Sequence, residues 1–371
     1  MNSRQRFLNC LNFKSVDHVP DMEFGAWDEN FPIWQEQGMP TSVKGNGHFD
    51  AYFGLESSAP ESPPMFINTW PSFEVKVLAE TERTKIIRQR DGVVEEVSKA
   101  GGSMPRFIDF PVKDWDTWKQ FKEEHYNINY PGRWDTTEAE WKALAKRLDD
   151  CDKPVPINCG GFYGFARDLM GVENISVAIA LDPELVEDIM ETRCEMVLKA
   201  MDIAFKYCRV DYGYWWEDMC YNYGPLISPD MFKTFMVPRY KRITSRLKRQ
   251  GVDLNIIDSD GDITLLVEPW LDAGINCFFP LEVRAGTDPW TLRQKYGKAA
   301  RFKGGVDKMQ LVSKDRIEKE LDRITPLVED GGYIPHVDHR VPPDVSFQNY
   351  LYYLKRKRER FGIPQPEIRK K

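Results

Sequence analysis

The chain has 371 residues, of which 42% are hydrophobic and 13% aromatic, and its formal net charge is −7. The apolar fraction is ample for a large core, whereas the negative charge disfavours binding to the phosphates of nucleic acids. No apolar stretch reaches the roughly 20 residues needed to span a bilayer, and the N-terminus lacks the apolar core of a signal peptide. Seven scattered cysteines, an odd number, do not suit a disulfide framework. We therefore expect a cytoplasmic protein without nucleic-acid or membrane partners.

The first 150 residues show little repeating order. Residues 4–13 have apolar residues at helical spacing, and residues 21–70 are rich in glycine, proline and aromatic residues, which predicts a loop-rich cap with one early strand. Residues 72–98 alternate apolar and polar side chains around an Arg-Asp-Gly turn signal, which predicts a small antiparallel β excursion. Two further helices are predicted over 114–124 and 137–148.

From Pro154 onward, short apolar strands alternate with helical stretches, a pattern typical of a parallel sheet. The predicted strands are Val155–Cys159, Val210–Trp215, Leu254–Ile257, Cys277–Phe279, Arg301–Gly304 and Tyr333–Pro335. The predicted helices are 165–171, 184–207, 229–250, 262–273, 288–296 and 313–330.

Six strand–helix units, with one or two earlier strands, predict the α/β class and a (β/α)8 TIM barrel with an N-terminal cap. An open doubly wound sheet would need a nucleotide-binding glycine fingerprint, and the Gly-Gly-Phe-Tyr-Gly segment at 160–164 lacks its spacing. We expect a single barrel domain over 1–371, and the basic cluster at 355–360 is expected to be a solvated helix face. Its parts are the cap, excursion and first barrel elements (1–150), the main barrel (151–361) and a tail (362–371).

Acidic residues or histidine follow five successive predicted strands. They are Glu217 and Asp218, then Asp258 and Asp260, then Glu282, then Asp307, and finally His336, Asp338 and His339. Barrel enzymes carry their active sites at the carboxyl ends of the strands, which predicts a shared site here. Helix capping is the structural alternative, above all for the Asp-x-Asp-Gly run that precedes the helix near Asp262. Crowded carboxylates either raise one another's pKa or hold a cation, and oxygen ligands with one imidazole suit zinc, manganese, iron or magnesium.

Four segments resemble the uroporphyrinogen decarboxylase-like superfamily. They are Arg-Gln-Arg-Phe-Leu-Asn-Cys-Leu-Asn-Phe-Lys-Ser-Val-Asp-His-Val-Pro (4–20), Pro-Leu-Glu-Val-Arg-Ala-Gly (280–286), Lys-Gly-Gly-Val-Asp-Lys (303–308) and Gly-Gly-Tyr-Ile-Pro-His-Val-Asp-His-Arg-Val-Pro-Pro-Asp-Val (331–345). The resemblance extends over nearly the whole chain and is strongest after Val155. It implies a (β/α)8 barrel and one of two kinds of enzyme, a porphyrinogen decarboxylase or a corrinoid- or thiol-linked methyltransferase.

The decarboxylases of this superfamily bind the many carboxylates of their substrate through an N-terminal arginine-rich motif. The corresponding stretch here, 22–28, has no arginine and two acidic residues. This reversal of charge argues against uroporphyrinogen as the substrate.

The methyltransferases of the superfamily typically hold zinc through a His-x-Cys pair and a later cysteine. The matching positions here are Asp258, Asp260 and His339, so the resemblance implies a divalent metal, zinc by preference, in a harder ligand set. Such a metal is a stronger Lewis acid and would polarise an oxygen atom of the substrate.

These considerations predict a metal-dependent methyltransferase that moves a methyl group from a small O- or N-methyl substrate to a corrinoid on a partner protein. Glu217, Glu282 and His339 are the predicted catalytic residues, with a carboxylic acid protonating the leaving atom. The predicted substrate-binding residues are Tyr163, Trp215, Trp216, Tyr221 and Arg340. Decarboxylation of a porphyrinogen or another acid, and a non-catalytic corrinoid-binding subunit, are the alternatives. A homodimer is compatible with the resemblance.

Overall fold

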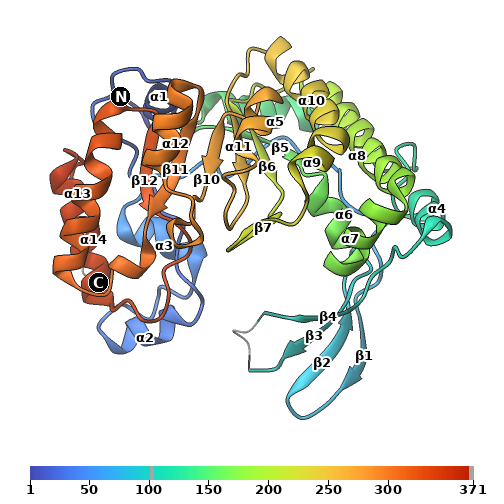
Figure 1. Ribbon diagram of the computed structural model, residues 1–371, viewed down its shortest axis with the longest axis horizontal. Coiled ribbons are helices and arrows are strands. Elements are labelled where there is room, and N and C mark those ends of the chain that lie inside the picture. Colours follow the sequence, from blue (N-terminus) through green and yellow to red (C-terminus); the bar gives the residue numbers. More distant parts are fainter. Residues whose placement is uncertain (101–103, 367–371) are drawn as a thin grey trace.

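A parallel sheet of six strands forms the centre of the protein (Figure 1). The computed structural model describes residues 1–100 and 104–366, so residues 367–371 of the predicted tail lie outside the described part. The strands are β5 (Pro156–Gly160), β6 (Tyr212–Trp216), β9 (Asn255–Asp258), β10 (Cys277–Phe279), β11 (Arg301–Val306) and β12 (Tyr333–Val337). Their order is β12-β11-β10-β9-β6-β5, and every neighbouring pair is parallel. All six predicted strands are confirmed, with small shifts at their ends.

Helices follow these strands and lie around the outside of the sheet (Figure 1). They are α6 (Tyr163–Met170), α7 (Val172–Leu181), α8 (Pro183–Ala204), α9 (Pro229–Phe235), α10 (Val237–Arg249), α11 (Val267–Asp272), α12 (Pro289–Tyr296), α13 (Lys314–Asp330) and α14 (Phe347–Arg360). The predicted helix 229–250 is two helices, because Pro238 occupies the first turn of α10 and cannot donate the hydrogen bond that would continue α9.

Two extended segments lie between the edge strands of the sheet. Val341, just after β12, exchanges backbone hydrogen bonds with segment 25–27 at 3.0 and 3.1 Å. Segment 56–59 donates backbone hydrogen bonds to the carbonyl oxygens of Asp21 (2.8 Å) and Pro154 (2.9 Å), the latter just before β5. The predicted early strand is therefore an extended segment with one isolated β-bridge. The α/β barrel class is confirmed: six regular strands form the parallel sheet, and the two extended segments form hydrogen bonds beside its edge strands.

The amino ends of the strands are covered by helix α1 (Ser3–Leu11), which Asn2 caps through a hydrogen bond from the Gln5 amide (2.9 Å). Phe7 of this helix packs on Tyr212 of β6 with ring centroids 5.3 Å apart. The same apolar cluster includes side chains of β9, β10 and β12. Alternate residues of a strand point to the same face, so these side chains share the inner face of the sheet and pack there against helix α1. Helix α1 does not cover the carboxyl ends of the strands, called here the barrel mouth, where barrel enzymes have their active sites.

The predicted antiparallel excursion is confirmed and is larger than expected. It is a four-stranded sheet of β1 (Lys76–Glu80), β2 (Thr84–Arg88), β3 (Val94–Ser98) and β4 (Arg106–Asp109), called here the arm (Figure 1). The predicted helices at 114–124 and 137–148 are α4 (Trp115–Glu124) and α5 (Glu138–Asp150). The loop-rich cap also contains helices α2 (Asn30–Glu36) and α3 (Asn46–Phe53). Among the described residues, no helix combines the length and the apolar character that a membrane-spanning segment requires.

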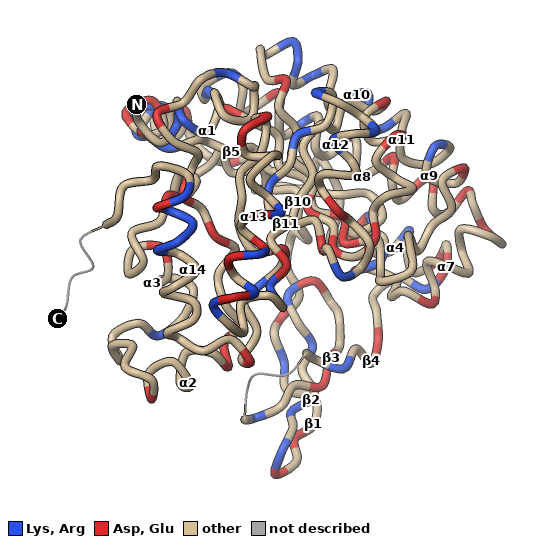
Figure 2. The backbone as a smooth tube through the Cα atoms, turned by 60° about the vertical axis from the view of Figure 1, so that its left-hand side comes forward, with Lys and Arg blue, Asp and Glu red and all other residues tan. Residues whose placement is uncertain are grey.

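The basic helix α14 corrects one expectation. Figure 2 shows basic residues along this helix, and Lys355 is exposed as expected. Lys357 and Arg358 are instead buried: Lys357 Nζ lies 2.6 Å from a Glu23 carboxylate oxygen and 3.0 Å from an Asp21 oxygen, and Arg358 Nε lies 2.7 Å from the other Asp21 oxygen. The helix therefore fastens the extended segment 21–27 to the barrel wall.

Candidate functional site

Two of the predicted site residues meet over the barrel mouth. His339 Nε2 lies 3.3 Å from Asp260 Oδ2. The imidazole packs against the rings of Phe24 and Trp27, with centroids 5.4 and 5.3 Å away. The second carboxylate oxygen of Asp260, Oδ1, is buried and has no hydrogen-bond partner among the described residues. The pair is therefore held on one side by aromatic rings and offers a free buried oxygen on the other.

Asp258 forms a different pair, because its carboxylate accepts a hydrogen bond from the Tyr214 hydroxyl. Burial raises the pKa of Asp258 to about 7, and the neighbouring charge of Asp260 acts in the same direction. Helix α11 begins at Val267 without a side-chain cap, so neither aspartate is explained by capping that helix.

The predicted metal ligands are thus divided between two pairs. Among residues 1–100 and 104–366, no group of three or more His, Cys, Asp or Glu side chains is arranged to hold a metal ion. Asp260 and His339 would serve as donors, whereas the Asp258 carboxylate is bound to a phenol. The residues present do not form a complete three-ligand set, so metal binding stays a prediction.

Glu217 is fully buried and accepts three hydrogen bonds. The backbone amides of Phe162 (2.7 Å) and Gly164 (2.8 Å) donate to its two oxygens, and the Tyr240 hydroxyl donates to one of them. Burial nevertheless raises the pKa of Glu217 to about 7. Because Phe162 and Gly164 lie at the start of α6, the carboxylate ties that helix to the end of β6. This placement favours a positioning role over direct contact with a substrate.

Glu282 connects three loops of the barrel mouth. Its carboxylate accepts hydrogen bonds from Lys308 Nζ (2.9 Å) and from the Gly261 amide (3.0 Å). Lys308 Nζ also lies 3.5 Å from an oxygen of Asp338, a buried residue that accepts a hydrogen bond from the Val283 amide at 3.0 Å. Burial raises the pKa of Asp338 to about 6. Glu282 is therefore placed to fix the loops after β9, β10 and β11 relative to one another.

The predicted substrate-binding residues lie in two environments. Tyr163 and Trp215 have no exposed surface and belong to the core beneath the helices. Their role in substrate binding stays a prediction, although neither side chain has surface that solvent reaches. Trp216 and Tyr221 are 37% and 49% exposed, and Arg340 is partly exposed next to His339. These three residues remain available to a ligand.

A cavity of about 390 Å³ inside the barrel was not predicted from the sequence. Its walls include Asn158, Tyr214, Phe279 and Lys303, which come from four different strands, and Phe24. Phe24 also packs against His339, so the cavity adjoins the Asp260–His339 pair. The predicted site residues follow the strand ends, whereas Lys303 lies within β11. The signal that could have found it is a charged residue in the middle of β11, two positions after Arg301 and therefore on the same face of the strand.

His336 is a second buried polar residue next to this cavity. Its imidazole packs against Phe279, with ring centroids 5.5 Å apart, and Nδ1 lies 2.7 Å from the Val337 carbonyl oxygen. Nε2 is buried and has no hydrogen-bond partner among the described residues. Burial, with the charge of Lys303, lowers the pKa of His336 well below its ordinary value. The ring is therefore neutral and keeps one free nitrogen.

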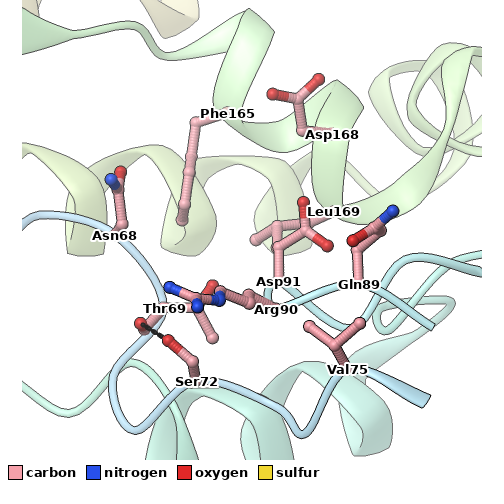
Figure 3. A pocket seen from close by; sticks show the side chains of 10 residues that line it. All are labelled: Asn68, Thr69, Ser72, Val75, Gln89, Arg90, Asp91, Phe165, Asp168 and Leu169. Carbon is pink, nitrogen blue, oxygen red and sulfur yellow. Dashed lines mark hydrogen bonds between the residues drawn. The ribbon is translucent and has the colours of Figure 1, made fainter.

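A larger cavity of about 670 Å³ lies between the arm and helix α6 (Figure 3). Arg90 and Asp91 face it from the arm, and Phe165 and Asp168 from the helix. None of the predicted site residues lines this cavity, and it is not formed by the ends of barrel strands. We therefore place the candidate active site at the barrel mouth.

Comparisons with known proteins agree with the barrel. A methyltransferase from Methanosarcina mazei has a similar structure, with a TM-score of 0.59 over 98% of this chain and 99% of that chain. The two sequences are 15% identical, so the similarity is evidence for the fold. No curated protein matches the chain. The family model for uroporphyrinogen decarboxylase (URO-D) matches residues 94–359, well over half of the sequence. The chain therefore belongs to the uroporphyrinogen decarboxylase (URO-D) family.

Proposed function

We infer that this URO-D family protein is a methyltransferase that moves a methyl group from a small O- or N-methyl substrate to a corrinoid on a partner protein. The observation that carries this proposal is the Asp260–His339 pair, 3.3 Å apart at the barrel mouth. The similarity in fold to a methyltransferase over nearly the whole of both chains supports it.

The Asp260–His339 pair can donate a proton to a leaving group. An alkoxide leaves poorly unless it is protonated, and an amine leaves more easily from its ammonium form. His339 is placed to give a proton to the oxygen of an O-methyl substrate, and Asp260 orients the imidazole, as a general acid requires; a quaternary ammonium leaves as a neutral amine and needs no proton. Glu217 and Glu282 position the surrounding loops in this proposal. The implied divalent metal, zinc by preference, would add Lewis acidity with Asp260 and His339 as donors, and no step above depends on it.

Decarboxylation of uroporphyrinogen is the less favoured alternative. The extended segment 21–27 contributes no cation to the mouth, and its Glu23 is neutralised internally by Lys357. A substrate with many carboxylates would find no arginines there.

The proposal is tested with the purified protein, chemically reduced cobalamin as the methyl acceptor, and a panel of O-methyl and N-methyl compounds. We expect methylcobalamin to form with one substrate class, and the activity to be lost in His339→Ala and Asp260→Asn. The matched controls His48→Ala and Asp202→Asn change exposed residues and should keep full activity. Consumption of uroporphyrinogen without methyl transfer would instead show the decarboxylase. Tight cobalamin binding with no turnover would show a non-catalytic corrinoid-binding subunit.

A further inference from the structure

The barrel cavity contains a cation that is not neutralised by a neighbouring carboxylate. Lys303 Nζ lies 4.7 Å from the centroid of the Phe279 ring. Ion pairs have a nitrogen–oxygen distance of at most 4.0 Å, and among the described residues no carboxylate oxygen lies that close to Lys303 Nζ. Its pKa is lowered, chiefly by burial. Lys303 is partly buried, and an ammonium that loses water without gaining a partner is costly, so the position suits a ligand that supplies an anionic group.

Two carboxylates lie close to residues that line this cavity. Asp258 is two residues beyond Ile256, which lines the cavity, so both project from the same side of β9. Asp258 is also held by Tyr214, another cavity residue. Asp50, on α3, is a second acid whose charge acts on Lys303. The cavity therefore has Lys303 on one wall, and the Asp258 carboxylate lies behind another wall, bound to Tyr214.

Aromatic rings complete the walls. Phe24, Tyr214 and Phe279 all line the cavity, and Phe24 meets Phe279 edge to face with centroids 4.7 Å apart. The faces of such rings attract ammonium groups, including methylated ones. The volume of about 390 Å³ is within the range of small-molecule sites, roughly 300–1,000 Å³.

A ligand that satisfies all three walls carries both charges. A simple carboxylate would leave the aspartates uncompensated, and a simple ammonium would face Lys303. We propose that the barrel cavity binds a small zwitterion, an N-methylated amino acid, with its carboxylate on Lys303 and its ammonium between Asp258 and the aromatic rings. This inference names a substrate class for the proposed function and rests on that function for any step after binding.

The test measures binding by isothermal titration calorimetry with three probes. Glycine betaine carries both charges, 3,3-dimethylbutanoate is its carbon isostere with the carboxylate alone, and choline carries the ammonium alone. We expect glycine betaine to bind at least about tenfold more tightly than either of the others. In Lys303→Met its affinity should fall about tenfold or more, and the affinity for choline should not fall. In Asp258→Asn the affinity for glycine betaine should fall, and that for 3,3-dimethylbutanoate should not. Lys142→Met, at an exposed position on α5, is the matched control.

A second measurement uses the unmodified protein and does not depend on the folding of a variant. Acetylation of lysines by an activated ester is followed by mass spectrometry with and without glycine betaine. The probe should slow modification of Lys303 and leave Lys142 unaffected. Equal affinities for the three probes, or no effect on Lys303 in either experiment, would overturn the proposal. Binding through Lys303 without methyl transfer would refute the proposed function and keep this site. Methyl transfer from another compound without betaine binding would do the reverse.

Discussion

His339 Nε2 lies 3.3 Å from Asp260 Oδ2, although the two residues follow strands that are not neighbours in the sheet. His339 comes after β12 and Asp260 after β9, and strands β10 and β11 lie between them. The loops after β9 and β12 therefore come together at the carboxyl ends of the strands. The pair is thus a product of the barrel topology, and it joins the last strand to the middle of the sheet.

Because they act together, the two residues should not contribute independently to methyl transfer. We expect His339→Ala and Asp260→Asn each to lower kcat by about 10²- to 10⁴-fold, the usual range for loss of a general acid. The double variant should lose little more than the worse single variant, since residues that act as a unit are not additive. Steady-state kinetics of the four proteins checks this. Multiplicative losses in the double variant would separate the roles of the two residues.

Metal analysis tests the ligand set implied by the family resemblance. If a metal binds, His339→Ala and Asp260→Asn should each reduce the metal content measured by mass spectrometry after dialysis. Asp258→Asn should reduce it less, because the Asp258 carboxylate is bound to Tyr214 and does not join the other two residues. Dialysis of the wild-type protein against a chelator gives the reference for the metal-free state. Wild-type protein that contains no metal after purification with added zinc would contradict the prediction.

The buried Glu217 makes stability depend on pH. Its folded pKa of about 7 lies above its ordinary value of 4.5. Its stabilising contribution is therefore fully present below about pH 4.5 and is lost as the pH rises through about 7. The shift corresponds to a change on the order of 3 kcal/mol. Glu217→Gln should remove this dependence, so the wild-type advantage over the variant should shrink between about pH 5 and about pH 8.

Urea unfolding at a series of pH values measures the effect. Asp202→Asn, at an exposed position, should show no such change with pH relative to the wild type. A constant difference between wild type and Glu217→Gln across the whole range would contradict the assignment. Glu217→Gln also places an amide group against backbone donors, which should cost about 1–3 kcal/mol at every pH.

The strands and the mouth could be predicted from sequence because both depend on local patterns. The apolar run Cys277–Phe279, which a proline and an acidic residue follow, predicts a strand from the sequence and is a strand in the structure. The meeting of Asp260 and His339 was predicted by the rule that strand ends converge. The individual roles of Glu217 and Glu282 were not, since their hydrogen-bond partners come from other loops.

The remaining differences between the sequence-based predictions and the structure arise from the direction of side chains and from pairs of residues far apart in the sequence. Trp215 and Trp216 are adjacent and chemically alike, but the pleat of the strand buries one and exposes the other. Lys303 lies within a strand, whereas the predicted site residues follow the strand ends, and the sequence alone does not show that a cavity lies beside it. Lys357 was expected to be solvated because its partner Glu23 lies at the opposite end of the sequence.

The Lys357–Glu23 pair is expected to hold the extended segment 21–27 against helix α14, and substitutions of Lys357 test this. Lys357 has no exposed surface and pairs with both Asp21 and Glu23, whereas Lys355 of the same helix is 65% exposed. Lys357→Met should lower the free energy of unfolding by about 3–5 kcal/mol, because it leaves buried carboxylates without their cation. Lys355→Met should change it by less than about 0.5 kcal/mol. Urea unfolding compares the two. The double variant Lys357→Met with Glu23→Gln should recover part of the loss, since removal of both partners avoids an uncompensated charge. Equal destabilisation by the two lysine substitutions would show that the buried pairing does not hold the segment.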